Sequence, residues 1–71
     1  MDLNKQVAEK LKELRMDRGL SQREVAKALF RSKQAYSNLE NGKRKIEIDD
    51  LALLANFHKK SLMYFLSDFE V

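Results

Sequence analysis

The chain has 71 residues, with 14 basic and 11 acidic side chains, so its formal net charge is +3. It contains no cysteine, which excludes disulfide bonds and thiolate metal sites within it and is typical of proteins of a reducing cytoplasm. With His58 as the single histidine, a zinc site would need carboxylates for its other ligands, so we expect neither a metal nor a cofactor.

The first predicted element is a helix that starts close to the N-terminus. Leu3, Val7, Leu11 and Leu14 recur at spacings of four and three, which indicates one apolar helix face. Gly19 predicts where this helix stops. The first ten residues are charged and lack the apolar stretch of a signal peptide, so we expect a cytoplasmic protein.

The second predicted helix starts at a capping box. Ser21 can accept a hydrogen bond from the backbone of Glu24, whose carboxylate can reach back to Ser21. Leu20 and Val25 flank this box as a hydrophobic staple. The helix can extend only to about Leu29.

The third predicted helix begins after Ser32, a second N-cap candidate, and covers about residues 33–41. Gly42 closes it. Tyr36 and Leu39 lie three residues apart, which places both on the inward face.

Two further short helices follow. Asp49 and Asp50 suit the first turn of the fourth helix, where acidic groups complement the helix dipole. Its expected buried stripe is Ile48, Leu51, Leu54 and Ala55. We expect Ser61 to cap the fifth helix and its residues Leu62, Phe65 and Leu66 to enter the core.

The fold predicted from these elements is an all-α bundle of about five short helices that stabilise one another by packing. The run of apolar residues 62–66, which no other run in the chain exceeds, is far shorter than the about 20 residues that cross a bilayer. We therefore expect no membrane partner.

Basic residues are concentrated in the middle of the sequence. Residues 21–45 contain seven basic and two acidic side chains, whereas residues 46–71 contain two basic and five acidic ones. This distribution is typical of a protein that lays one face on a polyanion. A lysine-rich solvated surface would give the same pattern.

The order and spacing of the segments LKELRMDRGLSQREVAKAL and SNLENGKRK make residues Leu11 to Leu66 resemble the phage repressor/Cro-type (XRE) helix-turn-helix family. The resemblance implies a single lambda-repressor-like DNA-binding domain over residues 1–71. Its helix-turn-helix motif would cover about residues 22–41 and its recognition helix about residues 33–41. It also implies a bacterial or phage protein that binds double-stranded DNA.

The sequence departs from the family in and after the turn. Phe30 stands where the family favours glycine with a positive φ, a conformation that strains a bulky residue by roughly 1–2 kcal/mol. We expect either a different turn shape or enough burial of the Phe30 ring to offset the strain. Arg31 and Tyr36 occupy positions where aliphatic side chains are usual.

The second helix of such a motif places its N-terminal residues in the major groove. The side chains on the face opposite Tyr36 and Leu39 can pair with base edges, and by resemblance they match base-contacting positions. These candidates are Lys33, Gln34, Ser37 and Asn38. An ordinary solvated helix face is the alternative interpretation.

Other residues match positions that contact the DNA backbone, which fixes register and carries little sequence information. The phosphate candidates are Gln22, Ser32, Asn41, Lys43 and Arg44, with Lys45 a looser one. The family commonly joins an arginine of the first helix to the glutamate before Asn-Gly. By that resemblance, Arg15 and Glu40 form a structural ion pair.

The C-terminal segment contains more large apolar side chains than one short helix can bury, which suggests a homodimer. The candidate dimer surface is Met63, Tyr64, Phe69 and Val71. These residues could instead fold over the core.

We expect a sequence-specific transcription regulator that is not an enzyme. The resemblance implies a repressor, since repression is the commoner role in the family. The alternative is a protein-interaction module, antitoxin-like or regulator-binding, that acts through its apolar C-terminal surface.

Overall fold

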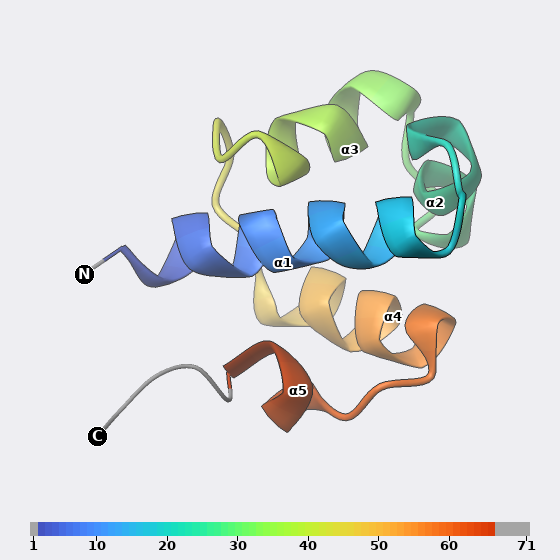
Figure 1. Cartoon of the computed structure of the whole chain (residues 1–71). Helices are drawn as coiled ribbons and strands as arrows, with labels where there is room; N and C mark the ends of the chain where they lie inside the picture. The colour runs from blue at the N-terminus through green and yellow to red at the C-terminus, as the bar shows by residue number, and fades with distance from the viewer. Residues whose placement is uncertain (1, 67–71) are drawn as a thin grey trace.

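The computed structural model describes residues 2–66, which form five helices and no strand. They are α1 (Leu3–Asp17), α2 (Gln22–Ala28), α3 (Lys33–Glu40), α4 (Ile48–His58) and α5 (Leu62–Leu66). The longest helix, α1, crosses the middle of the molecule, with α2 and α3 on one side and α4 and α5 on the other (Figure 1). The all-α prediction is confirmed.

The first helix begins as its sequence predicts and buries one face. The carboxylate of Asp2 accepts a hydrogen bond from the Lys5 N–H at 3.0 Å, which caps the helix. Val7, Leu11 and Leu14 are buried, but Leu3 is half exposed, which corrects its assignment to the apolar face. Leu3 is the first helical residue, so no earlier turn covers its side chain.

The capping box of α2 has both expected bonds. The Ser21 hydroxyl accepts from the Glu24 N–H at 3.1 Å, and the Ser21 N–H donates to a Glu24 carboxylate oxygen at 2.9 Å. The backbone bond from Ser21 lowers the pKa of Glu24. Ala26 is buried beside Val25, so a small side chain stands on the buried face of α2, the helix that packs against α3.

The turn between α2 and α3 contradicts both expectations for Phe30. Its φ is +57°, so the left-handed conformation of the family's glycine is kept, and its ring is 89% exposed. Burial of this ring therefore does not offset the backbone strain. The turn is held through its backbone, since the Arg31 N–H donates to the Ala26 carbonyl at 3.0 Å.

Ser32 caps α3 as predicted, because its hydroxyl accepts from the Ala35 N–H at 3.1 Å. The helix ends at Glu40, one residue before the predicted end, and Asn41 is its C-cap. Gly42 follows with φ +74°, a conformation that favours glycine.

The buried face of α4 differs from the prediction in its first turn. Leu51, Leu54 and Ala55 are buried, but Ile48 is 67% exposed and Asp50 is buried in its stead. An ion pair with Arg31 holds the Asp50 side chain inside, whereas Ile48 is the first residue of the helix and its side chain is left uncovered.

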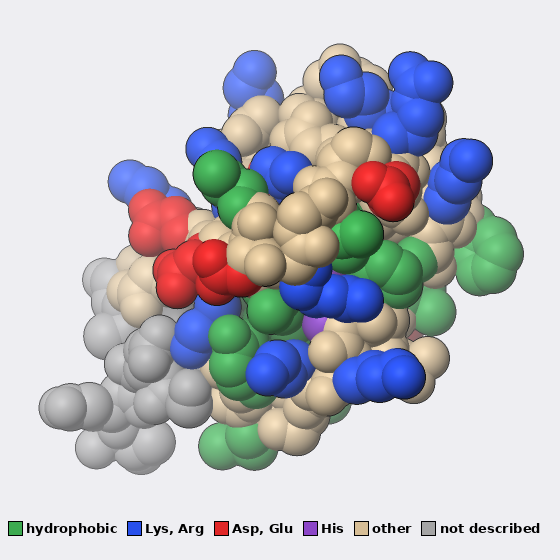
Figure 2. All heavy atoms as spheres, turned by 45° about the vertical axis from the view of Figure 1, so that its right-hand side comes forward, with side chains coloured by type: hydrophobic (Ala, Val, Ile, Leu, Met, Phe, Trp, Pro, Cys, Tyr) green, Lys and Arg blue, Asp and Glu red, His purple; other side chains and the backbone are tan. Residues whose placement is uncertain are grey.

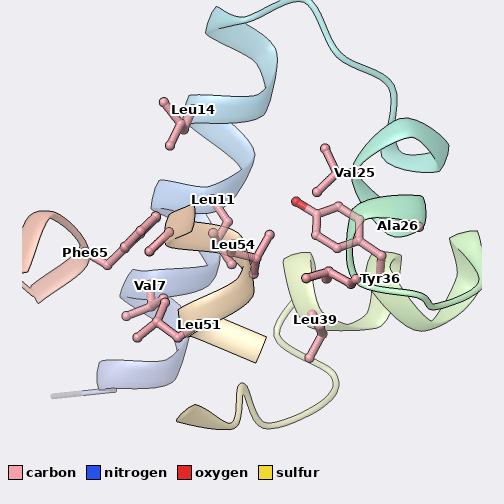
Figure 3. Close-up of a cluster of buried hydrophobic side chains, with 12 residues drawn as sticks. Val7, Leu11, Leu14, Val25, Ala26, Tyr36, Leu39, Leu51, Leu54 and Phe65 are labelled. Carbon is pink, nitrogen blue, oxygen red and sulfur yellow. The ribbon is translucent and has the colours of Figure 1, made fainter. Parts of the chain in front are cut away.

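In α5, Phe65 is buried and Leu66 half-buried, whereas Leu62 is exposed, which corrects its assignment to the core. Leu62 is the first residue of this one-turn helix, so it lies at the edge of the packed region. Side chains from all five helices meet in one core (Figure 3), formed by Val7, Leu11, Leu14, Val25, Ala26, Leu29, Tyr36, Leu39, Leu51, Leu54, Ala55 and Phe65.

Candidate nucleic-acid interface

One side of the molecule combines the start of α2, the exposed face of α3 and the loop that leads to α4. Figure 2 shows Lys and Arg side chains along the upper edge of the molecule, the side on which Figure 1 places α3 and α2. Of the basic residues between 21 and 45, all but the half-buried Arg31 are exposed, so the basic middle of the sequence lies at the surface, as a polyanion-binding face requires.

Four predicted base-contacting residues lie on α3, away from its buried side. Lys33 and Gln34 are exposed, and Ser37 and Asn38 are half-buried. The Gln34 amide donates to the Asn38 carbonyl oxygen at 3.1 Å, which links two of these side chains one helical turn apart. This bond restricts the rotamers of both side chains before any ligand arrives.

The predicted phosphate-contacting residues at the two ends of α3 both form side-chain hydrogen bonds within the protein. Ser32 holds the first turn through Ala35. At the other end, the exposed Asn41 donates from its side chain to the Ser37 hydroxyl at 3.1 Å. Both residues lie at the rim of the same face.

The Lys43 and Arg44 side chains are exposed in the loop after α3, and Lys45 is exposed beside them. The backbone N–H groups of Lys43 and Arg44 both donate to the Asn38 carbonyl, at 2.9 and 3.2 Å. These bonds fold the loop back over the end of α3, so two basic side chains lie close to the predicted recognition helix.

A residue that the sequence analysis missed also holds this loop. Asn4, in the first turn of α1, accepts from the Ile46 N–H at 2.7 Å and donates to the Arg44 carbonyl at 3.4 Å. Its partners are about 40 residues away in the sequence, so no local pattern predicts these bonds. The only local signal was an asparagine, which has a weak helix propensity, near the start of a helix.

Gln22 lies at the first position of α2 and is half-buried. Its amide donates to Glu40 at 3.2 Å, so its side chain is oriented from within the protein.

Arg15 and Glu40 join α1 to the end of α3. The Nε and Nη2 atoms of Arg15 each donate to a different oxygen of Glu40 at 2.8 Å, and Nη1 donates to the Leu20 carbonyl at 2.8 Å. Burial alone would raise the pKa of Glu40, but the hydrogen bonds from Arg15 and Gln22 hold it below its ordinary value. The bond to Glu40 raises the pKa of Arg15.

A second ion pair, which the sequence analysis did not find, joins the turn before α3 to α4. Arg31 donates from Nε and Nη2 to the same oxygen of Asp50, at 3.0 and 2.6 Å. The other oxygen of Asp50 accepts from the Glu47 N–H at 3.3 Å. The signal available in the sequence was Arg31 itself, at a position where aliphatic residues are usual.

The residues of the candidate dimer surface differ in their exposure to solvent. Met63 is exposed, whereas Tyr64 is half-buried, with its ring 4.9 Å from the ammonium of Lys10 and 4.8 Å from that of Lys60. Lys10 also donates to the Tyr64 carbonyl at 2.9 Å. Phe69 and Val71 lie outside the described residues.

Over residues 2–66, no three His, Cys, Asp or Glu side chains are grouped as a metal site would need. In the same part of the chain, none of the helices combines the length and apolar character needed to cross a membrane.

Comparison with known proteins agrees with this geometry. The sequence matches the helix-turn-helix family over residues 11–65. The fold is similar to the crystal structure of the clp gene regulator ClgR from C. glutamicum, with a TM-score of 0.86 and 26% sequence identity. That similarity covers 96% of this chain and 88% of the other. No curated protein sequence matches the chain.

Proposed function

Because the chain belongs to the XRE-type helix-turn-helix family and is a DNA-binding transcription regulator, we propose that it reads a specific sequence in the major groove of duplex DNA. The proposed domain is the whole chain, residues 1–71, with its motif at about residues 22–41. The observation that carries the proposal is the two-sided nature of α3. Its buried side is fixed by Tyr36, Leu39 and Glu40, and its other side is polar.

The proposed base contacts are those of the exposed side of α3. Lys33 can donate to guanine O6 and N7, and Ser37 can donate or accept. Gln34 uses one N–H for Asn38, so its carbonyl oxygen and second N–H remain for a bidentate contact with adenine. Asn38 then both orients Gln34 and adds a contact of its own.

The proposed phosphate contacts surround α3 and supply affinity without sequence preference. They are Gln22, Ser32, Asn41, Lys43 and Arg44. The first turns of α2 and α3, which follow Ser21 and Ser32, add the partial positive charge of helix N-termini, which attracts anions.

The Lys43→Ala substitution tests the phosphate contacts. We expect weaker binding to every duplex. The slope of the logarithm of the binding constant against the logarithm of the salt concentration (the salt slope) should fall by about one unit, because binding then releases about one counterion fewer from the DNA. Lys12→Ala is the control, because Lys12 is an exposed cation on α1, outside the proposed interface. An unchanged slope in Lys43→Ala would contradict a phosphate contact by this residue.

The proposed assembly is a homodimer that acts as a cytoplasmic repressor. A twofold axis would place two copies of α3 about 34 Å apart on a palindromic operator. Of the candidate dimer surface, Met63 is exposed among the residues that the structure describes, so the dimer contact is proposed there. The similarity to a gene regulator supports a role in transcription.

Selection from a pool of random duplexes at about 50 and 200 mM salt tests the whole proposal. We expect enrichment of an inverted repeat and a steep loss of affinity at the higher salt. No enrichment together with a flat salt response would overturn it in favour of a protein-interaction module.

A further inference from the structure

In the loop of residues 43–46, the side chains of residues 43–45 are exposed, and Ile46 alone packs against the core. Beneath the loop lies a hollow of about 200 Å³, lined by Leu3, Asn4, Val7, Lys45, Ile46, Leu51 and Leu66. A hollow on one side of a segment removes the van der Waals contacts that would otherwise fix its position. Hydrogen bonds must therefore fix much of the loop's course.

Those hydrogen bonds come from two elements. The first half of the loop is bound to α3 through the Asn38 carbonyl, and the Gly42 N–H donates to the Leu39 carbonyl at 3.3 Å. The second half is bound to α1 by Asn4, which uses both ends of one amide, accepting from Ile46 and donating to Arg44. The loop thus leads from α3 to α4 across a clamp supplied by the start of α1.

Asn4, the side chain that clamps the loop, is held on a stable part of α1. Asn4 lies in the first turn of a 15-residue helix whose N-terminus is capped by Asp2, and the neighbouring Val7 is buried. The bond to Ile46 is short, at 2.7 Å, and the bond to Arg44 is longer, at 3.4 Å. Together they tie two peptide groups of the loop to one side chain on a fixed helix. Asn4 bonds the carbonyl of Arg44, whose N–H donates to Asn38, so the peptide groups on both sides of this exposed cation are held.

We propose that Asn4 is a positioning residue for DNA binding, which holds residues 43–46 so that the Lys43 and Arg44 side chains face the phosphate backbone. Asn4 acts through the loop and makes no base contact itself. This inference rests on the proposed function. Its expected signature is a change in the electrostatic part of binding with the sequence preference of α3 preserved.

The test is the salt dependence of binding to a mixed-sequence duplex, measured with the full chain and with Asn4→Ala. We expect several-fold weaker binding and a salt slope lower by about one unit. Gln6→Ala is the matched control, since it removes an exposed amide from the same helix and keeps the slope of the original chain.

A double substitution separates positioning from general damage. In a Lys43→Ala, Arg44→Ala background the loop cations are gone, so adding Asn4→Ala changes neither affinity nor slope further. A further loss in this background would overturn the proposal, because Asn4 would then act elsewhere.

Asn4→Asp covers the case in which Asn4→Ala does not fold. It keeps the acceptor for Ile46, loses the donor to Arg44 and places an acid in the first turn, where the helix dipole favours one. Gln6→Glu adds the same charge nearby, and a larger fall in slope for Asn4→Asp supports the proposal. Equal slopes, or an unaltered slope in Asn4→Ala, overturn this inference alone, whereas absence of binding by the unsubstituted chain overturns the proposed function as well.

Discussion

The two ends of α3 are each held by an arginine–carboxylate pair, and the two pairs differ in how fully protein surrounds them. At the C-terminal end, the Glu40 side chain is completely buried and Arg15 is 13% exposed. Just before the N-terminal end, Arg31 is 29% exposed while its partner Asp50 is buried. The polarity is opposite, since α3 supplies the carboxylate at one end and the preceding turn supplies the arginine at the other.

The pairs also differ in geometry. Arg15 approaches Glu40 as a fork, with one N–H group on each oxygen, whereas Arg31 directs both of its bonds to a single oxygen of Asp50. The second oxygen of Asp50 accepts the backbone N–H of Glu47 at the start of α4. Glu40 therefore binds helices to one another, while Asp50 divides its carboxylate between an ion pair and a helix start.

The largest effect is expected at the more buried pair. Glu40→Ala leaves the Arg15 guanidinium without its partner in a largely buried position, and we expect a loss of about 3–5 kcal/mol in the free energy of unfolding. Urea unfolding measures this change, with the exposed Glu13→Ala as control. A loss below about 1 kcal/mol would mean that the pair behaves as a surface ion pair.

A smaller effect is expected at the other end. Arg31→Ala leaves Asp50 buried, but the carboxylate keeps its bond from Glu47 and water can reach the vacated site, so we expect a loss of about 2 kcal/mol. The same urea titration measures it, and the exposed Arg23→Ala serves as control. A loss equal to that of Glu40→Ala would remove the difference between the two ends.

Titration separates Glu40 from a third polar contact, between the exposed Arg18 and the buried His58. Arg18 donates to His58 Nδ1 at 2.9 Å, and burial, together with the charges of Arg18 and Lys60, lowers the pKa of His58. The unfolded chain then binds the proton more readily, so stability present above the ordinary pKa of 6.5 is lost as the pH falls below it. The depressed pKa of Glu40 predicts a further loss below its ordinary value of 4.5.

Thermal unfolding between pH 7.5 and 3.5 measures both steps. His58→Gln removes the upper step and keeps the lower one, because glutamine does not titrate and can accept from Arg18. A melting temperature that is flat between pH 7 and 5 in the unsubstituted chain would contradict the role of His58.

The smallest effect is a gain in the turn that carries Arg31. Phe30→Gly removes the cost of a left-handed φ, and the exposed ring contributes no burial to lose, so we expect a gain of about 1 kcal/mol. Phe30→Ala is the matched control, since it deletes the ring and keeps the strain. A lower melting temperature for Phe30→Gly than for Phe30→Ala would show that backbone strain is not the determining factor.

Much of the fold was predictable because the signals are local. Ser21 with Glu24, Ser32 before its helix and Gly42 after it mark helix ends through contacts within a few residues. The exposed Leu3, Ile48 and Leu62 were wrongly placed because each is the first residue of its helix. Periodicity assigns a residue to a face, but the neighbouring elements decide whether that face is covered at the helix end.

The five helices, the order of the motif and the polar residues displayed on α3 could be predicted from residue patterns, because helix capping and periodicity act over one or two turns of chain. Apart from the Arg15–Glu40 pair, which the family resemblance implied, the polar contacts of the interior were set by the tertiary structure. It brought Arg31 to Asp50, Arg18 to His58 and Asn4 to the loop before α4. Each of these contacts joins residues 19 to 42 positions apart, and its existence depends on how helices pack, which no local pattern of residues encodes.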